Sequence, residues 1–172
     1  MNNNLRFIVK KEDLLLKNLK IFFDNPQNMN IFYNIVTKDS SLSLRLIDYL
    51  CTNYSKNNHV VYYLDTSKKK LFTLHTKYRG QLKAYSKLQF DPFRRHDRIY
   101  IHCPYADDKH IETTVAQMNF FKWAIENKVL EWLFNNIRIV ESDMLIHGKE
   151  KKVPKEKKVP KEKKVPKEKK VP

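Results

Sequence analysis

Residues 59–76, HVVYYLDTSKKKLFTLHT, decide the fold class, because the hydrophobic pattern changes there from a helical to a strand-like period. Residues 59–64 and 71–76 are rich in β-branched and aromatic side chains, and a polar stretch separates them. Such runs are typical of paired strands. We therefore predict a β-hairpin here and a third strand at 98–103, RIYIHC, while the short apolar run at 5–9 is a candidate edge strand.

Helical patterns precede these strands. Apolar residues recur at helical spacing in 14–23, 29–36 and 40–58, and Ser40 or Ser41 offers an N-cap for the last of these segments. The residues that share one side of this last segment are Leu42, Leu46, Ile47, Leu50, Cys51 and Tyr54. This side is expected to face the core.

A second helical block follows the strands at 113–148, with Thr113 or Thr114 as its N-cap and Gly148 as its C-terminal stop. Its length suits two helices or one long kinked helix. Because about three strands lie between two helical blocks, the expected fold is α+β. We predict a small, mainly antiparallel sheet of about three strands, flanked by N- and C-terminal helices.

The C-terminal tail, 149–172, consists of four copies of KEKKVP. A proline every six residues removes a backbone donor and restricts the residue before it, so neither a helix nor a strand is expected to run through. We predict one globular α+β domain at 1–148 and a disordered basic tail at 149–172. Two interpretations of the tail stay open, an electrostatic arm for a polyanion or a solvated segment that arose by repeat expansion.

Composition excludes several classes of protein. No stretch approaches the about 20 apolar residues of a membrane span, and MNNNLR at the start has no secretory pattern, so no membrane partner is expected. The two glycines, Gly80 and Gly148, exclude glycine-rich phosphate loops. Cys51 and Cys103 form neither a disulfide framework nor a metal-binding clip. No cofactor is expected.

Positive charge is concentrated in two places. The chain has 34 Lys and Arg against 19 Asp and Glu, a formal net charge of +15. The tail accounts for +8 of this charge, and residues 77–98 for +5 of the +7 that remains. Clustered cations favour a polyanionic partner such as DNA or RNA, because each neutralised phosphate releases counterions.

The basic segment 77–98 supplies the candidate nucleic-acid-binding residues Arg79, Lys83, Lys87, Arg94, Arg95 and Arg98. The aromatic side chains interleaved with them, candidates for stacking on bases, are Tyr78, Tyr85 and Phe93. A short helix is predicted at 78–89, and it would place Arg79, Lys83 and Lys87 one turn apart in a basic stripe.

A competing interpretation of the same segment is structural. Tyr85, Phe90 and Phe93 would then be core anchors, and Arg94 or Arg95 would pair with an acidic neighbour such as Asp91. Aromatic residues of small domains are most often buried.

The remaining titratable residues predict no active site. Asp107, Asp108, His110 and Glu112 are expected in a polar, solvated loop. The alternative, a metal site, would need three or four of these ligands to converge. Adjacent His and Cys side chains at 102 and 103 lack an orienting third group. We therefore expect no catalytic residue, no metal site and no enzymatic activity.

Three stretches together resemble a known family: SLSLRLIDYLCTNYSKNN (41–58), YRGQLKAYSKLQFDPFRRHDRIYI (78–101) and IETTVAQMNFFKWAIENKVLEWL (111–133). They are similar to small proteins encoded by nucleocytoplasmic large DNA viruses of the mimivirus-like and phycodnavirus-like groups. The resemblance implies a viral origin and carries over no catalytic residue. Its most distinctive part is the arginine block after FDPF at 90–93.

Two functional hypotheses follow. The first is a non-enzymatic viral protein that binds DNA or RNA with little sequence specificity, through the six cations and the Lys-rich tail. The second is a minor virion or capsid-associated structural protein that contacts other virion proteins through the helices around 123–134. Either protein is expected in the host cytoplasm, at the viral factory, or in the virion.

Overall fold

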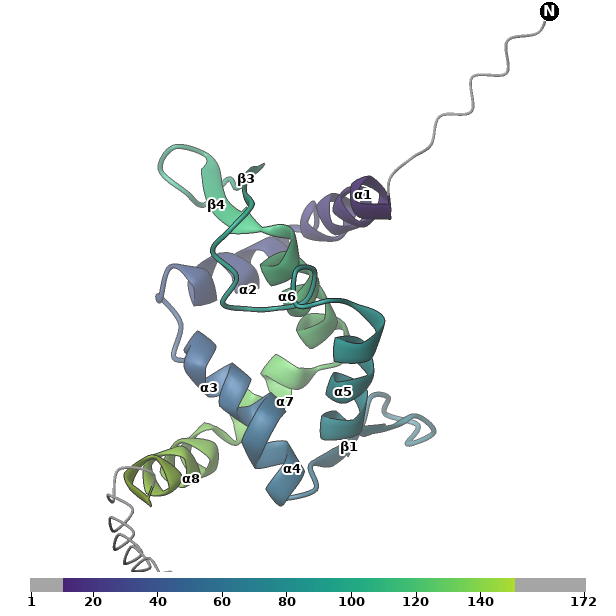
Figure 1. Cartoon of the computed structure of the whole chain (residues 1–172), viewed down its shortest axis with the longest axis vertical. Helices are drawn as coiled ribbons and strands as arrows, with labels where there is room; N and C mark the ends of the chain where they lie inside the picture. Colours follow the sequence, from purple (N-terminus) through teal and green to yellow (C-terminus); the bar gives the residue numbers. More distant parts are fainter. Residues whose placement is uncertain (1–10, 151–172) are drawn as a thin grey trace, which may run out of the picture.

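The computed structural model describes residues 11–150, and the side chains of 13–147. Its elements are α1 (Lys11–Phe23), α2 (Pro26–Val36), α3 (Leu44–Tyr49), a π-helical turn η1 (Leu50–Tyr54), α4 (Ser55–Asn57), β1 (Val61–Tyr63), β2 (Leu71–Thr73), α5 (Leu74–Ala84), β3 (Arg98–His102), β4 (His110–Thr114), α6 (Val115–Glu126), α7 (Val129–Asn135) and α8 (Ile137–Glu150). Helices surround α6, and the β3–β4 hairpin projects from one end of the molecule (Figure 1). The α+β class with flanking helices is confirmed.

The strands form two separate two-stranded antiparallel sheets, β1–β2 and β3–β4, where one sheet of about three strands was predicted. The predicted strand at 71–76 ends at Thr73, and Leu74 begins α5. Leu74 and Tyr78, four residues apart, are both buried, so helical packing against the core overrides the local alternation of 74–76. The strand predicted at 98–103 is confirmed as β3.

β4 occupies the region that was predicted to be a polar loop. Within it, Ile111 and Thr113 are buried, whereas His110 and Glu112 face solvent. This alternation with a period of two is typical of a half-buried strand. Thr114 pairs with Arg98 and His110 with His102, so β4 covers the whole length of β3.

The core gathers around α6, whose side chains are buried on most of its surface. Phe120, Phe121 and Trp123 of α6 meet Phe32 of α2 and Phe90 of the segment between α5 and β3. All six apolar residues predicted to share one side of 40–58 are buried. The N-cap of α3 is Ser43, whose hydroxyl accepts from the Leu46 amide, in place of the predicted Ser40 or Ser41.

The C-terminal region divides into three helices, where two helices or one kinked helix were predicted. The side-chain amides of Asn127 and Asn136 donate to the carbonyls of Trp123 and Trp132, four residues earlier, and end α6 and α7. Lys128 follows the first break with a left-handed φ of 54°. Gly148, the predicted stop, lies inside α8. Thr114 is confirmed as the N-cap of α6.

The candidate strand at 5–9 lies outside the described residues, as does the tail from 151 onward. The predicted boundary between a domain at 1–148 and a disordered tail at 149–172 therefore stays a prediction. Within the described part of the chain, no helix combines the length and the apolar character that a membrane crossing requires.

Candidate functional site

The basic segment is held against the first turns of α6 by hydrogen bonds. The Gln117 side chain donates to the Pro92 carbonyl at 3.0 Å, and the Asn119 side chain donates to the Gln89 carbonyl at 2.8 Å. The Asp91 amide donates to the Ala116 carbonyl. The connection between α5 and β3 consequently passes across α6 (Figure 1). The arginines that follow Pro92 line a cavity together with Thr114 and Gln117, at the N-terminal end of this helix.

Three of the predicted cations line one cavity of about 310 Å³. We call it the arginine cavity, and its lining residues are Val36, Leu44, Arg94, Arg95, Arg98, Glu112, Thr113, Thr114 and Gln117. Three arginines against one glutamate leave this cavity with a formal charge of +2. A cavity with such a lining suits an anion of phosphate type, because the planar guanidinium groups donate in pairs to phosphate oxygens.

The three guanidinium groups differ in their partners. Arg94 is largely buried and pairs with exposed Asp97 at 2.5 Å, and its Nε is buried without a hydrogen-bond partner among the described residues. Arg98 pairs with Glu112 across the hairpin, and its Nε donates to the Arg95 carbonyl. Arg95 is exposed, and the structure shows no ion pair for it within residues 13–147. Arg95 is thus the most available cation of the cavity.

Another part of the lining of the arginine cavity consists of polar side chains that bond to one another. Thr113 Oγ1 donates to Gln117 Oε1, and Thr114 Oγ1 accepts from the Gln117 amide at 3.1 Å. All three side chains are buried. Thr114 is the N-cap of α6 and Gln117 lies in its first turn, so the positive end of the helix dipole adds to the field of the arginines.

Two other predicted cations, Arg79 and Lys87, line a second cavity of about 340 Å³. We call it the aspartate cavity, and its lining residues are Asp48, Thr52, Tyr78, Arg79, Leu82, Lys87, Phe90, Asp91 and Pro92. Two acids offset the two bases, so its formal charge is zero. The structure places Lys83 on the exposed face of α5, outside both linings.

The predicted basic stripe does not form. α5 ends at Ala84, and Tyr85 is extended with φ −117° and ψ 140°. Lys87 therefore lies beyond the helix, and only Arg79 and Lys83 remain one turn apart on α5. The turn at 86–90, in which the Phe90 amide donates to the Ser86 carbonyl, replaces the last predicted helical turn and carries Phe90 into the core.

The three stacking candidates have different surroundings. Tyr78 is only 7% exposed and packs against Phe90 and Trp123, so its ring is a core residue and is not free to stack on a base. Tyr85 is half-buried and stacks on Phe90 with ring centroids 6.1 Å apart. Phe93 is 44% exposed. The structural interpretation thus holds for Phe90 and not for Phe93, which keeps an accessible ring, while Tyr78, which that interpretation did not name, is also a core residue.

Asp48 is the carboxyl group of the aspartate cavity with a perturbed pKa. Burial raises the pKa of its carboxyl, and the nearby charge of Asp91 raises it further. Both effects disfavour the ionised form. Asp48 lies on α3, one turn before Thr52 of the π-helical turn, whose hydroxyl donates to the Asp48 carbonyl at 2.8 Å.

Replacing Asp48 by asparagine is expected to stabilise the protein at pH 7. Because the folded pKa is raised, the folded state holds the proton more tightly, and the free energy of unfolding falls as pH rises from the ordinary carboxyl range through the raised value. Thermal unfolding between pH 3 and pH 7 should show similar melting temperatures for both proteins at low pH and a growing advantage of Asp48→Asn as pH rises. A variant that is less stable at pH 7 would contradict this assignment.

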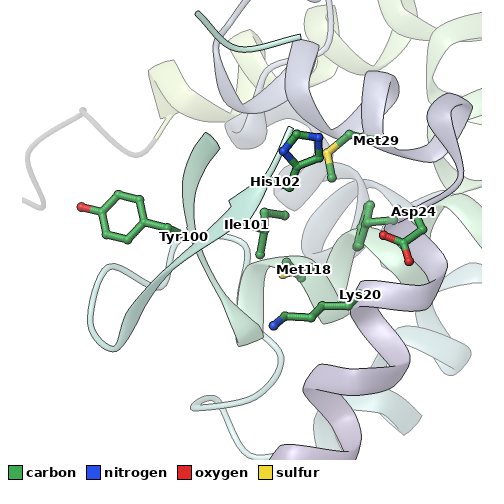
Figure 2. A pocket seen from close by; sticks show the side chains of 8 residues that line it. Lys20, Asp24, Met29, Tyr100, Ile101, His102 and Met118 are labelled. Carbon is green, nitrogen blue, oxygen red and sulfur yellow. The ribbon is translucent and has the colours of Figure 1, made fainter. Parts of the chain in front are cut away.

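A third cavity, of about 260 Å³, lies between α1 and β3 (Figure 2). Lys20 of α1, Asp24 directly after α1, Ile101 and His102 of β3, and Met118 of α6 surround it, whereas Tyr100 points away. None of the six predicted cations lines it. The neighbouring Cys103 is fully buried, so its thiol is shielded from solvent.

The acidic residues around the β3–β4 turn do not converge. Across the part of the chain that the structure describes, no three His, Cys, Asp or Glu side chains are placed to hold a metal ion together. Glu112 instead accepts from Arg98 and from the Tyr100 hydroxyl, and Asp108 caps the His110 amide.

The sequence analysis did not predict the residues that hold the basic segment in place through hydrogen bonds to its backbone. Gln117 and Asn119 carry polar amides in the otherwise apolar run VAQMNFFKWAI, and this interruption was the available signal for buried hydrogen-bonding roles. Asp48 gave no such signal, because its nearness to Asp91 arises from the packing of α3 beside the basic segment.

The fold and the cavities define a small α+β protein with an arginine-lined cavity at the start of its central helix. Comparison of sequences places the chain in a family: it belongs to a family of unknown function, DUF7197, which matches residues 1–171. It is similar to the uncharacterized protein L507 of Acanthamoeba polyphaga mimivirus, with 33% identity over 157 residues. The match covers 89% of this chain and 61% of that relative, so the chain spans about three fifths of the relative's length.

The resemblance to proteins of giant DNA viruses is confirmed by this family and this relative. No solved structure matches the chain.

Proposed function

We propose that this protein is a non-enzymatic viral protein that binds DNA or RNA with little sequence specificity. The observation that carries the proposal is the convergence of Arg94, Arg95 and Arg98 on one cavity with a formal charge of +2. A phosphate seated there would meet the guanidinium groups, of which that of Arg95 has no ion pair among the described residues. Contacts to phosphate position a nucleic acid without reading its sequence, which supports low specificity.

The surrounding charges support the same function. Arg79, Lys83 and Lys87 are exposed and lie on the α5 side of the basic segment, where they offer further cations for phosphate contacts. The tail adds a net charge of +8 on repeats of KEKKVP. We propose that the tail raises the general affinity for the polyanion, while the folded cations set its position. The protein would act at the viral factory in the host cytoplasm or in the virion.

The direct test is the salt dependence of binding. We expect the full chain to bind fluorescein-labelled 20-base duplex and single-stranded oligonucleotides at about 50 mM salt, with log affinity falling linearly against log salt concentration. Fluorescence anisotropy measures both quantities. A chain that ends at Glu150 should keep a shallower slope that reports the folded part. Absence of binding at about 50 mM salt, or an affinity that does not change with salt, would contradict the proposal.

An alternative function is that of a minor structural protein of the virion. The observation that favours it is the exposure of large apolar side chains near the C-terminal end, since Phe134 is 63% exposed, Ile139 60% and Ile146 58%. Trp123, by contrast, belongs to the core. Detection of the protein in purified particles that contain no nucleic acid, together with absence of oligonucleotide binding, would favour this alternative.

A further inference from the structure

The arginine cavity and the aspartate cavity are neighbours. Leu44 lines the first and Asp48 lines the second, and these residues lie four positions apart on α3, a rise of about 6 Å. On the other side, Pro92 lines the aspartate cavity while its carbonyl accepts from Gln117, which lines the arginine cavity. Two cavities of about 310 and 340 Å³ therefore lie side by side, separated by one helical turn and by the segment around Pro92.

The two cavities differ in chemistry as the phosphate and the base of a nucleotide differ. The arginine cavity offers donors and positive charge, which suit a phosphate. The aspartate cavity offers two carboxylates and two cations, Arg79 and Lys87, beside the apolar Leu82 and Pro92. The carboxylates are those of Asp48 and of Asp91, whose Oδ1 already accepts from the Phe93 amide. Ionised carboxylates only accept hydrogen bonds, and Arg79 and Lys87 only donate them, so this cavity suits a group that presents both donors and acceptors.

Asp48 occupies a position that costs stability. Its carboxyl is half-buried, and burial together with Asp91 raises its pKa. No ion pair offsets this cost among the side chains that the structure describes. Groups that destabilise the fold locally are characteristic of binding sites, because a ligand can satisfy what the fold leaves unfavourable. A ligand whose N–H groups donate hydrogen bonds to the Asp48 carboxylate would offset the cost of holding this charge in a half-buried position.

We propose that the aspartate cavity binds an unpaired guanine base whose phosphate lies in the adjoining arginine cavity. Guanine presents two adjacent donors, N1–H and the N2 amino group, and one carboxylate can accept both. Adenine presents an acceptor at N1, and thymine and uracil present one donor between two acceptors. This inference rests on the proposed function, and it adds to the sequence-independent phosphate contacts a preference at one base position in single-stranded nucleic acid.

The test uses the full chain and three labelled single-stranded 12-mers: all thymidine, the same strand with one central guanine, and the same strand with one central adenine. We expect the guanine strand to bind at least about fivefold more tightly than the all-thymidine strand, because one bidentate pair discriminates by about that factor or more. The adenine strand should bind like all-thymidine. Fluorescence anisotropy at a fixed salt concentration gives the three dissociation constants.

Asp48→Asn and Asp91→Asn test the assigned residues, with Asp13→Asn, an exposed position on α1, as the matched control. Each substitution removes one negative charge and so strengthens binding to every strand. The readout is therefore the ratio of the affinity for the guanine strand to the affinity for the all-thymidine strand. The ratio should fall to about one in Asp48→Asn or Asp91→Asn and stay at the wild-type value in Asp13→Asn.

The outcomes separate the two proposals. A wild-type ratio near one, an equal gain for adenine, or a ratio that survives both cavity substitutions would overturn the guanine assignment while leaving nucleic-acid binding intact. Absence of binding to all three strands would overturn the proposed function itself.

Discussion

Replacing Phe90 by alanine is expected to lower the free energy of unfolding by about 3–5 kcal/mol. Phe90 is 1% exposed, and its ring lies within 6.2 Å, centroid to centroid, of the rings of Tyr78, Tyr85, Phe120 and Trp123. Truncation removes buried apolar area and leaves a cavity that four aromatic neighbours cannot fill. Urea unfolding followed by tryptophan fluorescence measures the change.

Phe93 gives the matched control, because it is the same residue type three positions later and is 44% exposed. Phe93→Ala should change the free energy of unfolding by less than about 1 kcal/mol, in keeping with substitutions at exposed positions. Equal losses for the two variants would show that Phe90 does not anchor the basic segment to α6. The Phe90 variant should also bind oligonucleotides more weakly, since the arginines that follow it lose their fixed position.

Replacing Arg94, Arg95 and Arg98 together by glutamine is expected to lower the affinity for oligonucleotides on the order of 100-fold at 0.1 M salt. The magnitude of the salt slope should fall by about 2 for single strands and by about 3 for duplexes, because each arginine that is replaced leaves one phosphate without its neutralising cation. Glutamine keeps part of the side-chain volume and polarity. The acids that lose their ion-pair partners, Asp97 and Glu112, are themselves exposed and stay solvated.

A matched triple variant separates the cavity from general charge. Lys17, Lys38 and Lys128 are exposed, line none of the three cavities described above, and lie on α1, after α2 and before α7. Their combined replacement by glutamine removes the same charge and should weaken binding far less than the arginine triple. Equal losses of affinity for the two triple variants would show that net charge alone, and no particular surface, binds the nucleic acid.

Parts of the fold and of the site could be predicted because they depend on local patterns. The helical spacing in 40–58 predicted six buried side chains correctly, and Thr114 was among the two predicted N-caps of α6. Residues 110–114 alternate between exposed and buried side chains, as a strand does, but the polar His110 and Glu112 led to the prediction of a loop. The break of α5 before Lys87 could not be predicted, because it depends on Phe90 entering a core built by α6.

The sequence by itself determined the α+β class, the run of helices on both sides of the strands and the concentration of charge in 77–98, because each follows from periodicity or composition. Tertiary structure alone decided which cations act together. Packing of the segment around Pro92 on α6 sends Arg94, Arg95 and Arg98 to one cavity and leaves Arg79 and Lys87 beside Asp48 in another. The physical reason is distance along the chain: Asp48 and Lys87, for example, are 39 positions apart. Such residues meet only when buried rings and side-chain amide hydrogen bonds hold the basic segment across α6.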